Sequence, residues 1–415
     1  MQKPLVIISI SPFNASMLLL LLSFLKNSLH LKIPAVFEYC STRMALAAIV
    51  SLLFTIFFGK YFIKKLYEWK IGDRVRSEEC PLLGELHRNK NNTPTMGGIL
   101  ILSSMLTSLF LWMDLKNPFT LILFTTTIVI GTLGGVDDYL KLRYKNKQGV
   151  PGRRKLAVQV AFSCCIALYL LWTPLTQALH IYDWFPPPYA KEEAQTELLT
   201  LTTQKYAARL YLPFFKIPIF ELSGLGLFFM GIFFIFVITG TSNAVNLTDG
   251  LDGLATGILM LVASAFALIA FVSNHLDLSR YLHILYIDGS GEIAIYLSAL
   301  AGAALGFLWY NGYPAQVFMG DTGSLTLGAV IGVSAVLLKR ELLLMIIGGI
   351  FVIEAISVIL QVGSYKLRQK KRLFLCAPLH HHFEYKGWAE TKVVLRFWII
   401  GLLLAMVGIA TLKFQ

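Results

Sequence analysis

Carboxylate side chains stand at three places where apolar stretches of the chain give way to polar ones. Asp137 and Asp138 are neighbours in "GGVDDYLK", Asp249 and Asp252 are three residues apart in "TDGLDG", and Asp321 lies in "MGDTGS". On a helix, residues three apart share a face, whereas neighbours point about 100° apart. Carboxylates beside helix N-termini and lysines suit Mg²⁺ that protein and phosphate groups hold jointly. The pattern predicts a phosphate-handling magnesium site, and helix capping is the alternative for any single aspartate.

Three consecutive histidines, His380, His381 and His382, stand in "APLHHHFEYKGW" between two basic segments. Consecutive residues of a regular helix cannot all bind one metal ion, which argues against a zinc site. Imidazoles titrate near neutral pH and donate hydrogen bonds to phosphate oxygens. We therefore expect a phosphate-contacting loop, in which replacement of the histidines affects chemistry more than folding. The alternative is an interfacial segment without a chemical role.

Membrane helices are the elements that must position these side chains. Hydrophobic residues make up 56% of the 415 residues and charged residues 14%, whereas soluble domains carry about 25% charged residues. About 20 apolar residues cross the hydrocarbon core of a bilayer as a helix. The sequence therefore predicts an all-α, polytopic integral membrane protein with about ten transmembrane helices, at about 44–63, 95–113, 117–136, 156–173, 222–242, 254–272, 293–310, 322–338, 342–365 and 393–412.

The chain outside and between these helices divides into an N-terminal extension and one elongated loop. Residues 1–43 resemble a signal sequence or a short extra span and stay unassigned, and residues 44–415 form the ten-helix domain. The longest loop, about 174–221, faces the outside. It contains "WFPPPY", a rigid polyproline-like elbow, and a stretch at 190–210 that is expected to form a short amphipathic helix.

Basic residues concentrate in the connections at 64–90, 141–155 and 366–392, which fall on one side of the predicted bundle. The positive-inside rule makes this side cytoplasmic. All the aspartate and histidine segments fall on it as well, which predicts one active site at the cytoplasmic face. The net charge of +12 suits an anionic bilayer surface or a phosphorylated substrate. Nucleic acid is not expected as a partner, because no binding module is recognisable.

Transport is the alternative from a different functional class. Glu354, a carboxylate inside the ninth predicted span, would suit a secondary transporter, but transporters bind their substrates near the midplane of the bilayer, between repeated halves. Here the acidic residues gather at one surface and no repeat is found. We expect Glu354 to face the bundle interior and to bond to a neighbouring helix. The phosphate-binding motif GxxxxGK[ST] does not occur, which disfavours ATP-driven transport.

The chain resembles the phospho-N-acetylmuramoyl-pentapeptide transferases (MraY) over residues 44–415, in "TPTMGG", "VDDYLK", "NAVNLTDGLDGLA", "PAQVFMGDTGSL", "EAISVILQVGSYKLR" and "APLHHHFEYKGW". The aspartate motifs are typical of the polyprenyl-phosphate N-acetylhexosamine-1-phosphate transferase superfamily, and "HHHFE" with "KGW" is similar to the muramoyl-pentapeptide branch. The resemblance implies that phospho-MurNAc-pentapeptide is transferred from UDP-MurNAc-pentapeptide to undecaprenyl phosphate in the bacterial inner membrane, giving lipid I and UMP. A sister transferase that uses UDP-GlcNAc is the alternative.

The resemblance also implies roles for individual residues. Asp321 resembles the magnesium ligand, and Asp137 resembles the aspartate that deprotonates or orients the lipid phosphate, with Asp138 beside it. The three histidines resemble loop residues near the substrate. The resemblance further implies a homodimer, and both direct attack and a phosphoryl-enzyme stay open. The implied substrate-binding residues are Lys90, Asn243, Asn246, Asp249, Gly250, Leu251, Asp252, Asn311, Phe318 and Gln361.

Overall fold

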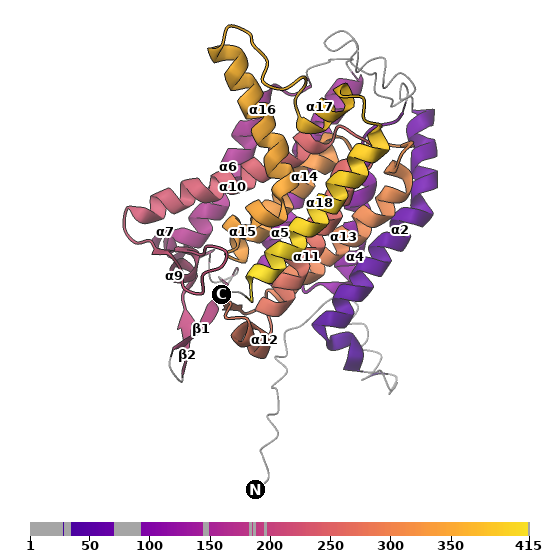
Figure 1. Ribbon diagram of the computed structural model, residues 1–415. Coiled ribbons are helices and arrows are strands. Elements are labelled where there is room, and N and C mark those ends of the chain that lie inside the picture. The colour runs from indigo at the N-terminus through magenta and orange to yellow at the C-terminus, as the bar shows by residue number, and fades with distance from the viewer. Residues whose placement is uncertain are drawn as a thin grey trace.

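Long helices make up most of the chain in the computed structural model, which describes residues 28, 35–69, 93–143, 149–181, 185, 188–194 and 197–413 (Figure 1). Among these residues, nine helices are long and apolar enough to cross a membrane. They are α2 (Cys40–Glu68), α5 (Pro118–Arg143), α6 (Gly152–Leu171), α10 (Gly226–Thr248), α11 (Leu254–Ser273), α13 (Gly291–Asn311), α14 (Gly320–Leu337), α16 (Gly349–Leu367) and α18 (Glu390–Thr411). The prediction of an all-α polytopic membrane protein is confirmed.

Two of the ten predicted spans differ from a single long helix. The second corresponds to α4 (Gly98–Trp112), which has 15 residues and is shorter than the other spans. The ninth is divided at Gly348 into α15 (Glu341–Ile347) and α16. Gly348 ends one helix and begins the next, and the N–H of Gly348 donates to Leu344 O at 2.8 Å.

Two other spans extend further than their apolar stretches. α5 continues to Arg143 and α10 continues to Thr248. Asp137 and Asp138 therefore lie on α5, which continues beyond the predicted end of the third span at about residue 136. Lys141 lies one turn beyond Asp137 and pairs with its carboxylate at 2.7 Å, so polar residues prolong the helix through a contact four residues apart.

α14 lies at the centre of the bundle and contacts α4, α5, α10 and α11. Its contact with α5 depends on a glycine: a Cβ added at Gly134 would lie 2.4 Å from the backbone oxygen of Asp321. Small residues allow membrane helices to approach this closely. The contact brings the "VDDYLK" segment of α5 against the start of α14.

The enlarged loop between α6 and α10 contains strands as well as short helices, so the amphipathic helix expected at 190–210 was wrong. After α7 (Thr173–Ala178), β1 (Ala190–Ala194) and β2 (Glu197–Leu201) form a hairpin. β1 also pairs with β5 (Tyr286–Ile287), which follows α12 (Leu276–Tyr281). Ala190 pairs with Leu201 of β2 and with Ile287 of β5, 97 residues away, and all three side chains are buried, which favours strand over helix here. The segment ends with α9 (Thr203–Ala207), β3 (Arg209–Leu210) and β4 (Phe220–Glu221).

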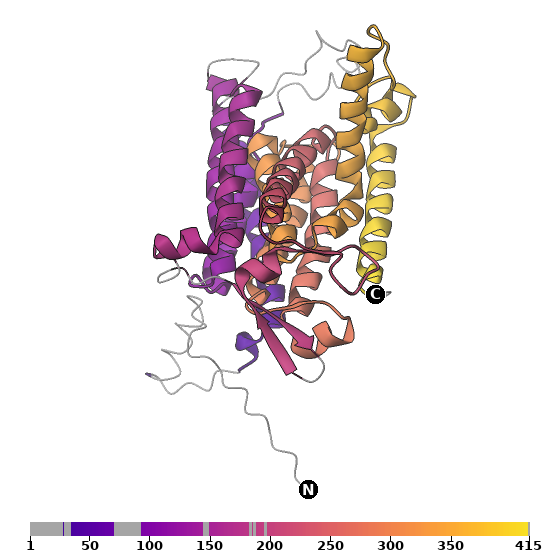
Figure 2. The same cartoon turned by 90° about the vertical axis from the view of Figure 1, so that its left-hand side faces the viewer.

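The strands and α12 lie at one end of the bundle, and α17 (Leu379–Tyr385) lies at the other (Figures 1 and 2). α16 extends beyond the bundle at the end that carries α17. The three aspartate segments and the histidine segment meet at this same end. We call it the site end, and we call the end with the strands the opposite end.

Candidate active site

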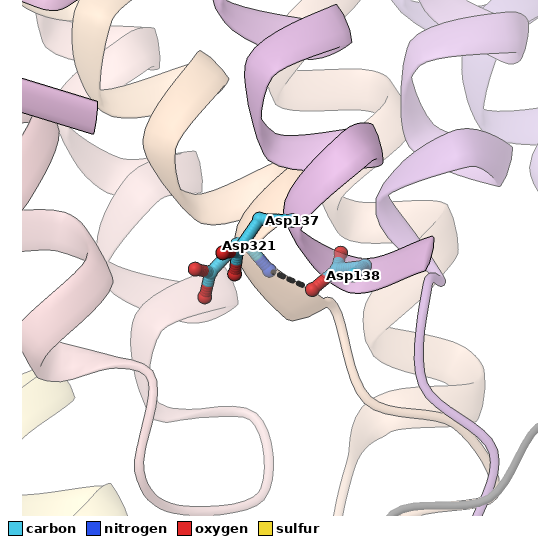
Figure 3. A group of neighbouring side chains, drawn as sticks. All are labelled: Asp137, Asp138 and Asp321. Atoms are coloured by element: carbon cyan, nitrogen blue, oxygen red, sulfur yellow. Dashed lines mark hydrogen bonds between the residues drawn. The ribbon is translucent and has the colours of Figure 1, made fainter. Parts of the chain in front are cut away.

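Three aspartates converge where α5 meets the start of α14 (Figure 3). One carboxylate oxygen each of Asp137, Asp138 and Asp321 lies within 4.8 Å of the others. Asp137 and Asp138 are buried, and Asp321 is half-buried. The three oxygens are hard ligands of the kind that Mg²⁺ prefers, and the close approach at Gly134 is what brings the two helices together here.

Asp138 binds the N-terminus of α14. Its carboxylate accepts hydrogen bonds from the N–H of Asp321 at 3.1 Å, from the N–H of Thr322 at 2.9 Å and from Thr322 Oγ1 at 2.6 Å. The first amides of a helix have no partner within the helix, and a carboxylate there also faces the positive end of the helix dipole. Asp138 thus fixes the backbone that carries Asp321.

Two lysines bridge the carboxylates of Asp137 and Asp321. Lys141 Nζ lies 2.7 Å from Asp137 Oδ2 and 3.2 Å from Asp321 Oδ2, and for Lys155 Nζ the two distances are 2.8 Å and 2.7 Å. Asp137 Oδ1 accepts the N–H of Val150 at 2.7 Å. Sequence reasoning counted both lysines as loop charges. Lys141 lies four residues after Asp137 on a helix, and this spacing could have predicted their contact. Lys155 lies in the first turn of a different helix, α6, so the sequence contains no signal for its contact with Asp137.

α10 adds two asparagines, which the structure separates. Asn246 Nδ2 donates to Asp321 Oδ1 at 2.9 Å and to Ser324 Oγ at 2.8 Å, so it lies at the acidic cluster. Asn243 lies about one turn earlier and donates to Gln159 Oε1 at 2.9 Å and to the backbone oxygen of Thr239. Asn246 therefore touches the cluster directly, whereas Asn243 joins α10 to α6.

The turn between α10 and α11 contains Asp249, Leu251 and Asp252. Their spacing would place the two aspartates on one face of a helix, but this segment is not helical, so they do not share a helical face. Asp252 accepts the N–H of Ala315 at 3.0 Å, and Leu251 is buried. Burial, together with the nearby carboxylates of Asp321, Asp138 and Asp252, raises the pKa of Asp249 to about 7. Asp249 is thus electrostatically part of the acidic cluster.

Asn311 and Phe318 flank the connection from α13 to α14. Asn311 is buried: its Oδ1 accepts the N–H of Gly253 at 3.1 Å and Thr256 Oγ1 at 2.8 Å, and its Nδ2 donates to Val317 O. These bonds tie this connection to the Asp249–Asp252 turn. Phe318 is half-buried, and its backbone pairs with the "TPTMGG" segment through Pro94 and Gly97. Lys90, the remaining basic candidate, lies outside the described residues.

The histidines lie on the short helix α17 and not in a loop. Glu354 of α16 accepts the N–H groups of Leu379 and His380 at 2.7 Å and 3.1 Å. Glu354 Oε1 also lies 3.2 Å from His380 Nδ1, although the geometry is not that of a hydrogen bond. Neither side chain is exposed. Glu354 therefore faces the bundle interior and binds a neighbouring helix, as the sequence predicted.

His380 and His381 reach the Asp249–Asp252 turn at Gly250. A Cβ at Gly250 would lie 2.4 Å from His380 Nε2 and 3.3 Å from His381 Nε2, so a side chain here would displace both rings. On its other edge, His381 Nδ1 lies 2.7 Å from Glu384 Oε2. Both Nε2 atoms thus face the turn that carries Asp249.

His382 and Gln361 hold the segment that joins α16 to α17. His382 Nδ1 accepts the N–H of Leu375 at 3.1 Å. Burial and the nearby ammonium of Lys386 lower the pKa of His382, which keeps this nitrogen free to accept. Gln361 Oε1 accepts the N–H groups of Leu373 and Phe374. In this structure both side chains order a loop at the site end.

Carboxylates, lysines and histidines thus gather at one end of the helices of a multi-pass membrane protein. This arrangement is typical of membrane transferases that act on phosphorylated substrates. Residues 120–339 match the family described as "Glycosyl transferase family 4", and residues 90–102 match "Phospho-N-acetylmuramoyl-pentapeptide-transferase signature 1". A "Phospho-N-acetylmuramoyl-pentapeptide-transferase" of Protochlamydia amoebophila (strain UWE25) is 62% identical over 96% of this chain and 100% of its own length. Another, from Thermodesulfovibrio yellowstonii, is 43% identical over 92% of this chain and 95% of its own length. The chain belongs to the phospho-N-acetylmuramoyl-pentapeptide-transferase family.

Proposed function

We propose that the chain transfers phospho-MurNAc-pentapeptide from UDP-MurNAc-pentapeptide to undecaprenyl phosphate and thereby makes lipid I for peptidoglycan synthesis. An oxygen of the acceptor phosphate becomes bonded to the sugar-linked phosphorus of the donor, and UMP leaves with the bridging oxygen. One phosphoanhydride is broken and one is formed, so the reaction needs no ATP. The resemblance to relatives of this name over nearly the whole chain supports the reaction.

The contacts of Lys141 and Lys155 are the observation that carries this proposal. Both ammonium groups lie within 3.2 Å of two carboxylates from different helices, in a partly enclosed site. Such lysines are held in place before a substrate arrives, and they can exchange a carboxylate partner for a phosphate oxygen. Preorganised positive charge is what a reaction between two phosphate groups requires.

Mg²⁺ fits the same donor set. Asp137 Oδ2 and Asp321 Oδ2 are contacted by the lysine side chains, which can move when a metal ion or a phosphate binds, whereas both oxygens of Asp138 accept backbone N–H groups at the start of α14. We therefore infer that Asp321 is the principal magnesium ligand and that Asp137 is available as a second. A bound Mg²⁺ would neutralise charge on the diphosphate. Asn246 would hold Asp321 Oδ1 in position.

The remaining roles follow from position. Asp137 lies on α5, a membrane-spanning helix, and would accept a proton from the lipid phosphate or orient it. His380 and His381 would face the donor across Gly250, beside Asp249. The donor site would also include Lys90, Asn243, Leu251, Asp252, Asn311, Phe318 and Gln361, several of them through the loops that they order.

We also propose that the site end is cytoplasmic and that the bilayer is the bacterial inner membrane. Basic residues in the connections at this end support the orientation, because basic loops lie on the cytoplasmic side of a membrane. The orientation also suits the substrate, since UDP-linked donors arrive from the cytosol. A homodimer stays a prediction from the family resemblance.

The decisive experiment measures UMP release by the reconstituted protein from UDP-MurNAc-pentapeptide and, separately, from UDP-GlcNAc, each with undecaprenyl phosphate. We expect turnover with the first donor, and its complete loss in excess EDTA with recovery on added Mg²⁺. Turnover with UDP-GlcNAc alone would favour the sister transferase.

A thermal-shift assay separates metal binding from activity. Mg²⁺ should raise the melting temperature of the parent and of Asp277→Asn, a change on exposed α12 at the opposite end. It should not raise that of Asp321→Asn. Full turnover of Asp321→Asn at ordinary Mg²⁺ would contradict the ligand assignment.

A further inference from the structure

The turn between β3 and β4, residues 211–219, exposes large apolar side chains at the opposite end of the molecule. Phe215 is 52% exposed and Ile217 is 74% exposed, and Phe214, Ile219 and Phe220 are exposed as well. Lys216 is the one charged residue between Leu210 and Phe220. We call residues 211–219 the apolar turn. Large exposed apolar patches mark contacts with another protein or with a membrane.

The base of this hairpin is well anchored, so the exposure does not come from a loose segment. The N–H of Ile219 donates to Leu210 O at 2.9 Å, and Arg209 pairs with Glu221 at 2.8 Å. Tyr211, the first residue of the apolar turn, is buried and lies under the guanidinium of Arg340, which is 5.4 Å from the ring centre. The protein therefore holds one side of the turn and presents the other outward.

The exposed surface continues directly onto a membrane-spanning helix. α10 begins five residues after β4, and its exposed side chains near that end include Phe228, Phe229, Ile232 and Phe236. Figures 1 and 2 place the segment that leads into α10 at about the height of the C-terminal end of α18. An apolar surface that adjoins the lipid-facing side of a span, at the level where α18 ends, is expected to contact lipid.

We propose that the apolar turn inserts into the bilayer leaflet at the opposite end and anchors the first turn of α10. Phe214, Phe215 and Ile217 would enter the acyl-chain boundary, while Lys216 would extend to the lipid phosphates, as lysines at membrane interfaces do. The β1–β2 hairpin at the same end offers a contrast, because Lys191, Glu192, Glu193 and Glu197 fall within its two strands. We therefore expect that hairpin to lie in water.

The test uses the full chain in liposomes that contain a phospholipid with a photoactivatable diazirine in its acyl chain. After irradiation and digestion, mass spectrometry measures the label on each peptide. We expect residues 210–221 to carry several-fold more label than residues 190–201, and about as much as the first half of α10. Labelling of 210–221 no higher than that of 190–201, with α10 labelled, would overturn the proposal.

A variant and a second probe complete the design. Ile217→Asp should lower the label on 210–221 several-fold and leave the label on α10 beyond its first turn unchanged, whereas Leu199→Asp, at an exposed position of β2, should change neither. Hydroxyl-radical footprinting in the same liposomes reports contact with water. If the apolar turn is protected from both lipid label and radicals, another protein or a second copy covers it, and the lipid proposal is wrong.

Discussion

Glu354 and His380, 26 residues apart in the chain, form one of the contacts that join the histidine helix to the membrane bundle. The carboxylate accepts the backbone N–H of His380 at 3.1 Å and lies 3.2 Å from its Nδ1, and both side chains are fully buried. A buried carboxylate needs such partners, because an unpaired one is costly. The contact gives an acidic residue of an apolar helix the partners that it needs, and it predicts how α17 responds to mutation.

Glu354→Ala should reduce both stability and turnover. The N–H groups of Leu379 and His380 lose their acceptor, and for the buried one of His380 this costs roughly 1–3 kcal/mol. Glu354→Gln keeps a carbonyl oxygen and should recover most of the stability, but it removes the negative charge beside the His380 ring. Thermal unfolding in detergent and UMP release measure the two effects. Equal stability of all three proteins would contradict the capping role.

His380 and His381 should differ in their response to alanine. His380 is fully buried, so His380→Ala leaves a cavity and should lower the melting temperature as well as turnover. This corrects the expectation that all three histidines lie in a loop. His381 is half-buried, so His381→Ala should fold and purify like the parent and turn over slowly. Matching losses of yield and turnover for His381→Ala would favour a structural role there too.

Asp138 should act mainly through the start of α14. Asp138→Ala removes the acceptor of two amides and one hydroxyl, and loss of an N-terminal helix cap costs about 1 kcal/mol before burial is considered. Asp138→Asn retains one acceptor oxygen and should be intermediate in melting temperature. Thr322→Val serves as a matched control, because it removes only the hydroxyl bond. A fully stable but inactive Asp138→Ala would point to direct participation in the chemistry.

Asp137→Asn should depress turnover while leaving donor affinity nearly intact. A general base contributes about 10²–10⁴-fold, and its loss matters less when the acceptor is already ionised. The second ionisation of a phosphate monoester lies near pH 6, so higher pH should partly restore the variant. Calorimetry with UDP-MurNAc-pentapeptide and a pH–rate profile test the two parts. Lost donor binding would move Asp137 to the nucleotide site, and intact binding without restoration would favour orientation or a covalent role.

Asp249 should make the metal-free protein less stable as pH rises. Its pKa is raised from an ordinary value of 3.8 to about 7, so the folded state holds a proton between these values that the unfolded state has released. The free energy of unfolding therefore falls as pH rises from about 4 to about 7. Asp249→Asn should flatten this part of the curve, as measured by melting temperature against pH in EDTA. An unchanged slope would show that Asp249 is already ionised.

Apolar stretches and residue spacing alone predicted the class of this protein. Twenty apolar residues have one stable arrangement in a bilayer, a helix with its backbone bonded internally, so the spans followed directly from the sequence. The motif acids and histidines were found because polar residues are rare in such a chain. Lys141 was within reach of the same reasoning, since it lies four residues after Asp137 on a helix.

The tertiary structure decided what these residues contact. Lys155 meets Asp137 and Asp321 because three helices converge, and no local pattern reports that convergence. Asp138 turned out to bind the start of α14, and the strand β1 pairs with β5, a segment far along the chain, as well as with its neighbour β2. Local sequence specifies which backbone groups need partners. The packing of helices that are distant in sequence determines which side chains become those partners. Such contacts depend on distances of a few ångströms between segments whose sequences contain no sign that they will meet.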